Sequence, residues 1–233
     1  MVLFDAMFLV SFFGLQILAT NFSQSIAVFA TSAIIFIILS LIYYLIVLFV
    51  FSFFKYSILD FIKSLFEKTG CSFKRLGQFY SLNLIIAGIF FAIMILANFL
   101  LASIKEQYRP FVFIFLAAPY LLFLYVIINT SHSLFYQDNS IKDTIKKSFS
   151  ITFTKIKIYR ETILIMIIYA LVLWLLFFGS GYLLRLLTSK NYSLYLNAYA
   201  HFKQISVIAF DLVFYFIILI NRISFYSIIK ENK

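Results

Sequence analysis

The sequence predicts an all-α membrane protein, a polytopic transmembrane helical bundle, and three observations predict it. Hydrophobic residues make up 64% of the 233 residues and charged residues only 12%, whereas soluble domains average about 25% charged residues. Long uncharged runs recur along the chain, and a transmembrane helix needs about 20 mostly apolar residues. These runs are apolar on every side and do not alternate, which excludes transmembrane strands. A soluble globule and a disordered chain are excluded by the same composition.

Six mostly apolar runs are expected to cross the membrane, at residues 2–19, 26–54, 79–104, 111–129, 162–184 and 205–221. The first run is short and carries Asp5, so it either spans the membrane or lies in its interface. We expect it to span, because six crossings bring the remaining charges into one orientation. No Lys or Arg precedes it, so a cleaved signal peptide is not expected. Residues 1–233 are therefore predicted to form a single integral membrane domain.

The Lys and Arg residues predict the orientation of these crossings. Fourteen of the nineteen fall on one side of the membrane and five on the other. Because loops rich in Lys and Arg stay in the cytoplasm, we expect both termini and both long loops there, with the plasma membrane as the location. The net charge of +10 is then explained by topology and by anionic headgroups. Nucleic acid is not an expected partner, because no compact basic domain presents this charge.

Each long loop is predicted to contain an amphipathic helix that lies on the inner membrane surface. In residues 55–70 the apolar side chains follow helical spacing, and residues 141–153 carry a similar stripe. Basic residues surround both stripes, and anionic headgroups attract such residues. The candidate anionic-lipid contacts are Lys63, Lys68, Lys74, Arg75, Lys142, Lys146, Lys147, Lys155 and Lys157.

The two loops also suggest an internal duplication, with repeats at residues 26–104 and 111–184. A shift of 79 residues aligns four identical residues, which are Ile62 with Ile141, Lys63 with Lys142, Lys68 with Lys147 and Tyr80 with Tyr159. Convergence on the same membrane-surface chemistry would give the same pattern. Many transporters pack two related halves around a central site, but a plain structural duplication fits a parallel repeat equally well.

This arrangement of a basic surface helix, an aromatic run and a long apolar crossing resembles a known group of proteins. It resembles small uncharacterised six-helix membrane proteins common in archaea, related to the membrane domain attached to some glycerophosphodiester phosphodiesterases. Residues 64–84 and 141–163 carry the resemblance, which covers most of the chain after Ile26. The resemblance implies a fold and no activity, because in that domain the chemistry belongs to a soluble partner domain.

Polar residues inside the predicted crossings are candidates for function, because they are costly in a bilayer. Asp211 lies in the sixth run, in the outer third on this topology, and Arg185 ends the fifth run and is placed to pair with it. Together with Asn98 and Gln16 they form a candidate polar intramembrane site for a substrate or a proton. The alternative interpretation is a set of hydrogen-bonded contacts between packed helices.

A second polar set lies at the inner ends of the runs and comprises Asn83, Asn129, His132, Asn221 and Arg222. We interpret it as interfacial and helix-capping residues. No His, Cys or carboxylate stands at metal-ligand spacing from His132, so no metal site and no cofactor are expected.

A serine nucleophile is a further alternative, because Ser180 stands between two glycines and His201 follows in the next predicted outer loop. Close helix packing explains the glycines more simply.

The sequence therefore favours a non-catalytic multi-spanning membrane protein that acts as an accessory, scaffold or lipid-interacting module. Its expected partners are anionic lipid headgroups, and a protein partner or a second copy of the chain is an alternative. A small transporter or channel with its polar site around Asp211 is the second hypothesis. An intramembrane enzyme is the third, since few catalytic groups are present.

Overall fold

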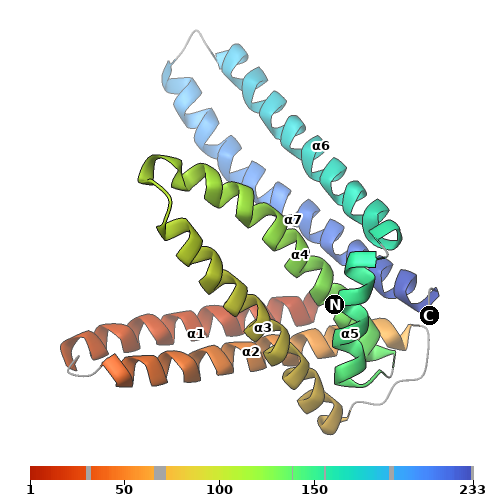
Figure 1. The fold of residues 1–233 in the computed structure, drawn as a ribbon. Helices are drawn as coiled ribbons and strands as arrows, with labels where there is room; N and C mark the ends of the chain where they lie inside the picture. Colours follow the sequence, from red (N-terminus) through yellow and green to blue (C-terminus); the bar gives the residue numbers. More distant parts are fainter. Residues whose placement is uncertain (30–32, 66–71, 138, 155, 189–191, 232–233) are drawn as a thin grey trace. The chain divides into compact units, whose positions relative to one another are not determined.

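The computed structural model describes residues 1–29, 33–65, 72–137, 139–154, 156–188 and 192–231, which form helices and no strands (Figure 1). The predicted all-α class is thus confirmed for this part of the chain. In chain order the elements are α1 (Val2–Phe29), α2 (Ala33–Ser64), α3 (Phe73–Ala102), the short 3-10 helix η1 (Glu106–Tyr108), α4 (Arg109–Tyr136), α5 (Ile141–Thr154), α6 (Ile156–Thr188) and α7 (Tyr192–Glu231).

Six of these helices are long and apolar enough to cross a membrane, namely α1, α2, α3, α4, α6 and α7. They overlap the six predicted runs, which confirms the number of candidate spans. The helices nevertheless extend well beyond the apolar runs. The short link expected at residues 20–25 is part of α1, and α7 begins at Tyr192 and not at residue 205. Apolar runs mark the membrane-compatible part of a helix, whereas polar residues without Gly or Pro let the helix continue.

The first predicted surface helix is wrong as a separate element, because α2 runs without a break from Ala33 to Ser64. No Gly or Pro interrupts this stretch, so nothing in the backbone ends the helix at the predicted membrane boundary. Ile58 and Ile62 of the predicted stripe are buried in the protein, while Phe61 and Leu65 are exposed. The remaining predicted positions, residues 66–70, lie outside the described residues.

The second predicted surface helix is a separate element, α5, of 14 residues. Its N-terminus is fixed by a capping box. The Ser140 hydroxyl donates to Asp143 Oδ2 at 2.6 Å, and the Asp143 amide donates to Ser140 Oγ at 3.2 Å. Thr144, Ser148 and Thr152 form a buried stripe on this helix. Apolar residues such as Ile141 and Ile145, which the sequence placed on the membrane, are half-buried beside it.

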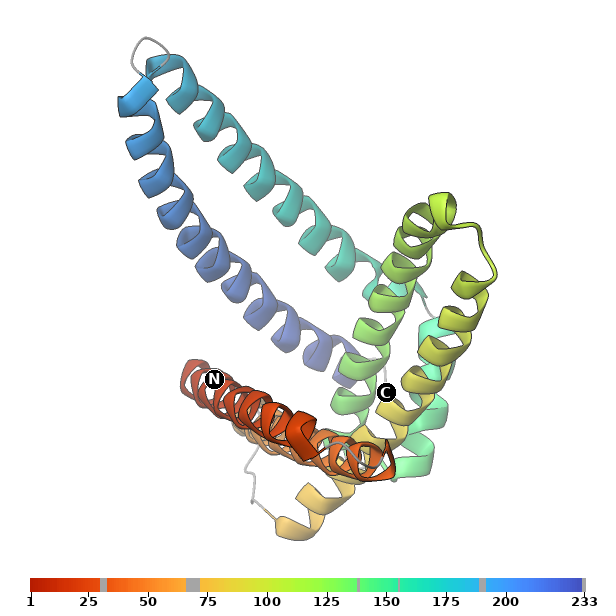
Figure 2. The same ribbon diagram turned by 90° about the vertical axis from the view of Figure 1, so that its left-hand side faces the viewer.

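The chain divides into two compact units, residues 1–152 and 153–233. In the first unit α1 packs on α2, α2 on α3, and α4 on both α2 and α3. Figures 1 and 2 show the α1–α2 hairpin crossing the α3–α4 hairpin. The buried apolar core of this unit lies where α2, α3 and α4 meet, and its most buried members include Ile58, Ile62, Phe79, Leu82 and Ile127.

The second unit is a long hairpin of α6 and α7, two helices that contact each other (Figure 1). The rings of Phe177 and Phe210 meet edge to face with centroids 5.8 Å apart. An added Cβ on Gly181 would come within 3.3 Å of the Phe202 ring. The missing side chain of Gly181 therefore leaves room for Phe202, and these two contacts fix the register of the hairpin.

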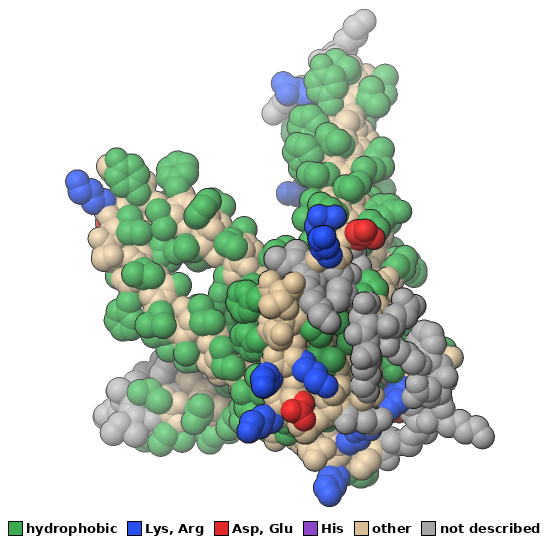
Figure 3. Space-filling model, turned by 45° about the vertical axis from the view of Figure 1, so that its right-hand side comes forward, with side chains coloured by type: hydrophobic (Ala, Val, Ile, Leu, Met, Phe, Trp, Pro, Cys, Tyr) green, Lys and Arg blue, Asp and Glu red, His purple; other side chains and the backbone are tan. Residues whose placement is uncertain are grey.

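Large apolar side chains cover the outer surface of the long helices (Figure 3). Phe115 is 80% exposed and Leu187 is 83% exposed. Exposed apolar area on this scale is costly in water and suits a lipid environment. Lys and Arg side chains gather over α5 in the same view. The six helices and this surface suit a multi-spanning membrane protein.

Candidate functional site

Three helices of the first unit are joined by a buried chain of polar side chains, which we call the polar network: Ser52 of α2, Asn83 of α3 and His132 of α4. The Asn83 Nδ2 donates to Ser52 Oγ at 2.9 Å, and His132 Nε2 lies 2.6 Å from Asn83 Oδ1. Ser52 Oγ in turn donates to the carbonyl oxygen of Leu48 at 2.7 Å. All three side chains are at most 4% exposed.

The directions of these hydrogen bonds follow from what each group can donate. Because the Asn83 amide nitrogen donates to Ser52, the amide oxygen is the atom that faces His132. That oxygen only accepts, so His132 Nε2 donates its proton to it. The Phe79 ring lies against the imidazole with centroids 4.7 Å apart. The three buried side chains thus hydrogen-bond to one another in place of water, and they join α2, α3 and α4 at one point.

A second set of contacts holds the C-terminal end of α4, where helix carbonyl groups have no partner within the helix. Lys63 Nζ of α2 donates to the Tyr136 carbonyl oxygen at 3.1 Å, and Arg75 Nη2 of α3 donates to the Phe135 carbonyl oxygen at 3.2 Å. The Arg75 guanidinium also lies 5.6 Å from the centre of the Phe135 ring. Cations at this end favour the negative end of the helix dipole.

The corner between α4 and α5 is fixed by Asn139 and Lys147. Asn139 Nδ2 donates to the Leu134 carbonyl oxygen at 2.7 Å, and Lys147 Nζ donates to Asn139 Oδ1 at 2.9 Å. With the capping box of Ser140 and Asp143, these contacts set the direction in which α5 leaves α4. The lysines of α5 are therefore presented from a firmly held helix.

The predicted lipid contacts divide into three groups in the structure. Lys63, Arg75 and Lys147 make the intramolecular contacts just described. Lys68 and Lys155 lie outside the described residues. The remaining four, Lys74, Lys142, Lys146 and Lys157, have exposed side chains. Lipid binding by these residues stays a prediction.

The predicted polar intramembrane site has two members in each unit. Gln16 lies on α1 and Asn98 on α3, both exposed. Arg185 lies on α6 and Asp211 on α7, and both are also exposed. No ion pair joins Arg185 to Asp211 in the described part of the hairpin. Asp211 lines a groove of 350 Å³ together with Lys203 and Ser206.

The register of the hairpin explains why this pair does not form. The Phe177–Phe210 contact places Asp211 close to the level of Phe177. Arg185 is eight residues further along α6, and eight residues of helix span about 12 Å. The predicted pairing assumed that α7 starts near residue 205, but the helix starts at Tyr192, which moves Asp211 deeper into the hairpin than the end that carries Arg185.

No hydrogen bond joins Ser180 to His201 among the described residues. The Ser180 hydroxyl donates to the carbonyl oxygens of Leu176 at 2.8 Å and Phe177 at 3.1 Å, which belong to its own helix. His201 is exposed on α7. The described residues also contain no group of three His, Cys, Asp or Glu side chains that could hold a metal ion.

The sequence analysis placed Asn83 and His132 in one set of interfacial and capping residues, whereas the structure buries both side chains and joins them. It missed Ser52. Residues 45–54 are apolar except for Ser52. A buried polar residue in such a stretch needs a partner, so this feature could have identified it. Which helices meet at Asn83 depends on tertiary contacts that the sequence pattern does not contain.

Comparison with known proteins gives no relative for this fold. No family model matches the chain, and no curated protein or solved structure shows significant similarity to it. The resemblance to six-helix membrane proteins stays a prediction.

Proposed function

We propose that this chain is a non-catalytic multi-spanning integral membrane protein that binds anionic lipid headgroups through α5 and serves as an accessory, scaffold or lipid-interacting module. The observation that carries the proposal is the exposed pair Lys142 and Lys146 on a capped helix. Residues four apart share one face of a helix. The two ammonium groups therefore point in a common direction, as headgroup binding needs.

The arrangement of the other polar groups supports a role without catalysis. His132 and Asn83 are engaged in the polar network, and the Ser180 hydroxyl is engaged by its own helix. A nucleophile needs a base within hydrogen-bond reach, and none of these contacts supplies one. Asn83 and His132 serve the packing of helices, which is a common role of polar side chains in membranes.

The test of this proposal is lipid retention by the full-length protein in nanodiscs that contain phosphatidylglycerol and phosphatidylcholine. Each basic residue near an anionic surface contributes about 1 kcal/mol, which is about fivefold in affinity. We expect Lys142→Gln with Lys146→Gln to retain less phosphatidylglycerol in native mass spectrometry, with the difference shrinking at high salt.

The matched control removes the same two charges elsewhere, by Lys105→Gln with Lys203→Gln, both of which are exposed. This control should retain phosphatidylglycerol like the unmodified protein. Equal retention by all three proteins would refute the role of α5.

A small transporter or channel is the second candidate function, because Asp211 lines a groove within the candidate span Ser193–Ile229. An ionisable residue at such a position is costly unless it has a role. Its test, the Asp211→Asn variant, is described in the Discussion.

A further inference from the structure

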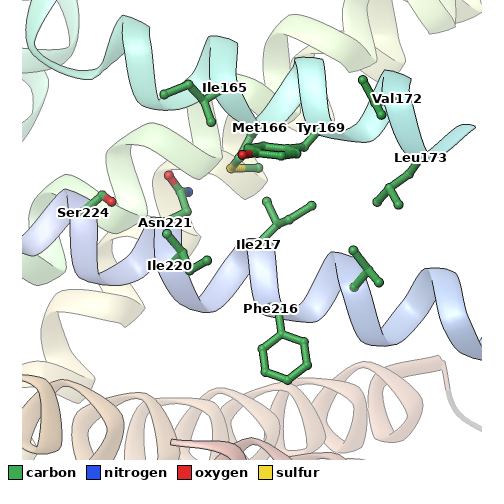
Figure 4. A pocket seen from close by; sticks show the side chains of 11 residues that line it. Ile165, Met166, Tyr169, Val172, Leu173, Phe216, Ile217, Ile220, Asn221 and Ser224 are labelled. Atoms are coloured by element: carbon green, nitrogen blue, oxygen red, sulfur yellow. The ribbon is translucent and has the colours of Figure 1, made fainter.

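Two grooves lie within the α6–α7 hairpin, and they differ in charge. The larger groove has a volume of 480 Å³ and lies between α6 and α7 (Figure 4). Its lining is apolar apart from the polar groups of Tyr169, Asn221 and Ser224, none of which is charged. The smaller groove has a volume of 350 Å³ and is lined by both Lys203 and Asp211. Of the two, the smaller groove therefore has the charges that can select a ligand.

The smaller groove, which we call the Asp211 groove, has side chains of both charges on one side of α7. Its lining on α7 comprises Tyr199, Phe202, Lys203, Ser206, Val207, Phe210 and Asp211, and Phe177 lines it from α6. Lys203 and Asp211 are eight residues apart, which places them about 12 Å apart along the helix and about 80° apart around it. Neither side chain makes an ion pair among the described residues. Each charge is thus available to a ligand.

The end of the groove that carries Asp211 suits a cation without N–H groups. The rings of Phe177 and Phe210 line the groove beside this carboxylate, and ring faces attract cations. A primary ammonium would bring three N–H donors, and Asp211 is the one charged acceptor in the described lining. A donor left without a partner is costly. A quaternary ammonium has no N–H group to satisfy, so it fits this end better.

The other end of the groove suits an anion. Lys203 and Ser206 are three residues apart, so they are neighbours on one face of α7. The Ser206 hydroxyl makes no hydrogen bond among the described residues, whereas the Ser180 hydroxyl donates to its own helix. An ammonium and a hydroxyl group can both donate to the two oxygens of a carboxylate.

We propose that the Asp211 groove binds a small zwitterion in which a short chain joins a quaternary ammonium to a carboxylate. The ammonium lies beside Asp211, and the carboxylate lies beside Lys203 and Ser206. Ser206 and Asp211 are five residues or about 7.5 Å apart along the helix, so several bonds must separate the two charges of the ligand. The proposal rests on the second candidate function, for which it names the substrate class, and it is independent of lipid binding by α5.

The position of Asp211 favours a free solute over a lipid headgroup. Asp211 is eighteen residues from either end of the candidate span Ser193–Ile229, and Lys203 is nearer to the N-terminal end. A zwitterionic phospholipid holds its ammonium at the membrane surface and would bring it to the end that carries Lys203, where like charges repel. A free solute can enter in the opposite orientation, and transporters place their substrate sites near the middle of the membrane.

The test is equilibrium binding of radiolabelled γ-butyrobetaine, in which methylene groups join a trimethylammonium to a carboxylate. The full-length protein is held in phosphatidylglycerol nanodiscs, and saturable binding at about one molecule per chain is expected. Asp211→Asn and Lys203→Gln should each weaken binding about tenfold, as the loss of one contact to a charged group does. Glu161→Gln and Lys157→Gln are the matched controls, since both residues are exposed on α6 outside the groove. Both controls should bind like the unmodified protein.

Two partial ligands separate the direct contacts from any effect on folding. Choline lacks the carboxylate, and butanoate lacks the ammonium. Choline binding should be weakened by Asp211→Asn and not by Lys203→Gln, whereas butanoate binding should be weakened by Lys203→Gln and not by Asp211→Asn. A variant that merely unfolds the hairpin would lose both ligands.

The absence of saturable γ-butyrobetaine binding would overturn the proposal, as would full affinity in Asp211→Asn. Phosphatidylcholine in the nanodiscs should leave the binding unchanged. Displacement of γ-butyrobetaine by phosphatidylcholine would assign the groove to a lipid headgroup and overturn the proposed solute. Binding without uptake into proteoliposomes would support the site and refute transport of this ligand, so the two failures can be told apart.

Discussion

In the first unit, hydrogen bonds between polar side chains join three helices, whereas in the second unit aromatic rings pack two helices together. Ser52, Asn83 and His132 bond to one another across α2, α3 and α4. In the hairpin the Phe177 ring of α6 packs against the Phe210 ring of α7, and Ser180 bonds to its own helix. Both kinds of contact hold helices together in a membrane, but a hydrogen bond across helices also requires each partner at one position. We therefore expect substitutions in the polar network of the first unit to lower stability more than substitutions of polar groups in the hairpin.

The largest effect on stability is expected from Asn83→Leu. It leaves the buried groups of Ser52 and His132 without their amide partner, which costs about 2 kcal/mol of the free energy of unfolding. Asn98→Leu is the matched control, since Asn98 is on the same helix but exposed. Thermal unfolding in detergent measures both. Equal losses would show that the polar network does not hold the helices together.

Removal of the Arg75 side-chain charge by Arg75→Met is expected to cost about 1 kcal/mol, because the Phe135 carbonyl group loses a charged donor at the end of α4. Lys74 is the neighbouring residue and is exposed, so Lys74→Met should change the free energy of unfolding by less than about 0.5 kcal/mol. The same thermal measurement applies. A larger loss of unfolding free energy from Lys74→Met than from Arg75→Met would contradict the role given to Arg75 at the end of α4.

The sequence predicted some parts of the fold and not others. The apolar runs predicted six membrane-compatible helices, because length and hydropathy are local properties. The end of α2 was misplaced, because Ile58 and Ile62 pack against the protein and not against the membrane. The pairing of Arg185 with Asp211 also failed to appear, since it depended on where α7 begins. Helix ends and partners are decided by tertiary contacts, which hydropathy does not describe.

A small effect on stability is expected from Asp211→Asn, because this exposed carboxylate makes no ion pair among the described residues. The change in the free energy of unfolding should stay below about 0.5 kcal/mol. In proteoliposomes, proton and potassium flux should equal that of protein-free vesicles for both the unmodified protein and the variant. Flux that disappears with Asp211→Asn would support the transporter hypothesis instead.

The smallest effect is expected from Ser180→Ala. The Ser180 hydroxyl donates only to carbonyl groups of its own helix, which already accept backbone hydrogen bonds, so its loss should be within about 0.5 kcal/mol. Thermal unfolding and phosphatidylglycerol retention should both match the unmodified protein. A hydrolytic activity lost in this variant would revive the enzyme hypothesis.

The central claim is that the chain binds anionic lipid, and native mass spectrometry of the full-length protein, extracted gently from its own membrane, tests it most directly. We predict retained anionic phospholipid on each chain, reduced by Lys142→Gln with Lys146→Gln and not by Lys105→Gln with Lys203→Gln. Retention of lipids in the proportions of the bulk membrane, unchanged by either pair of substitutions, would contradict the claim.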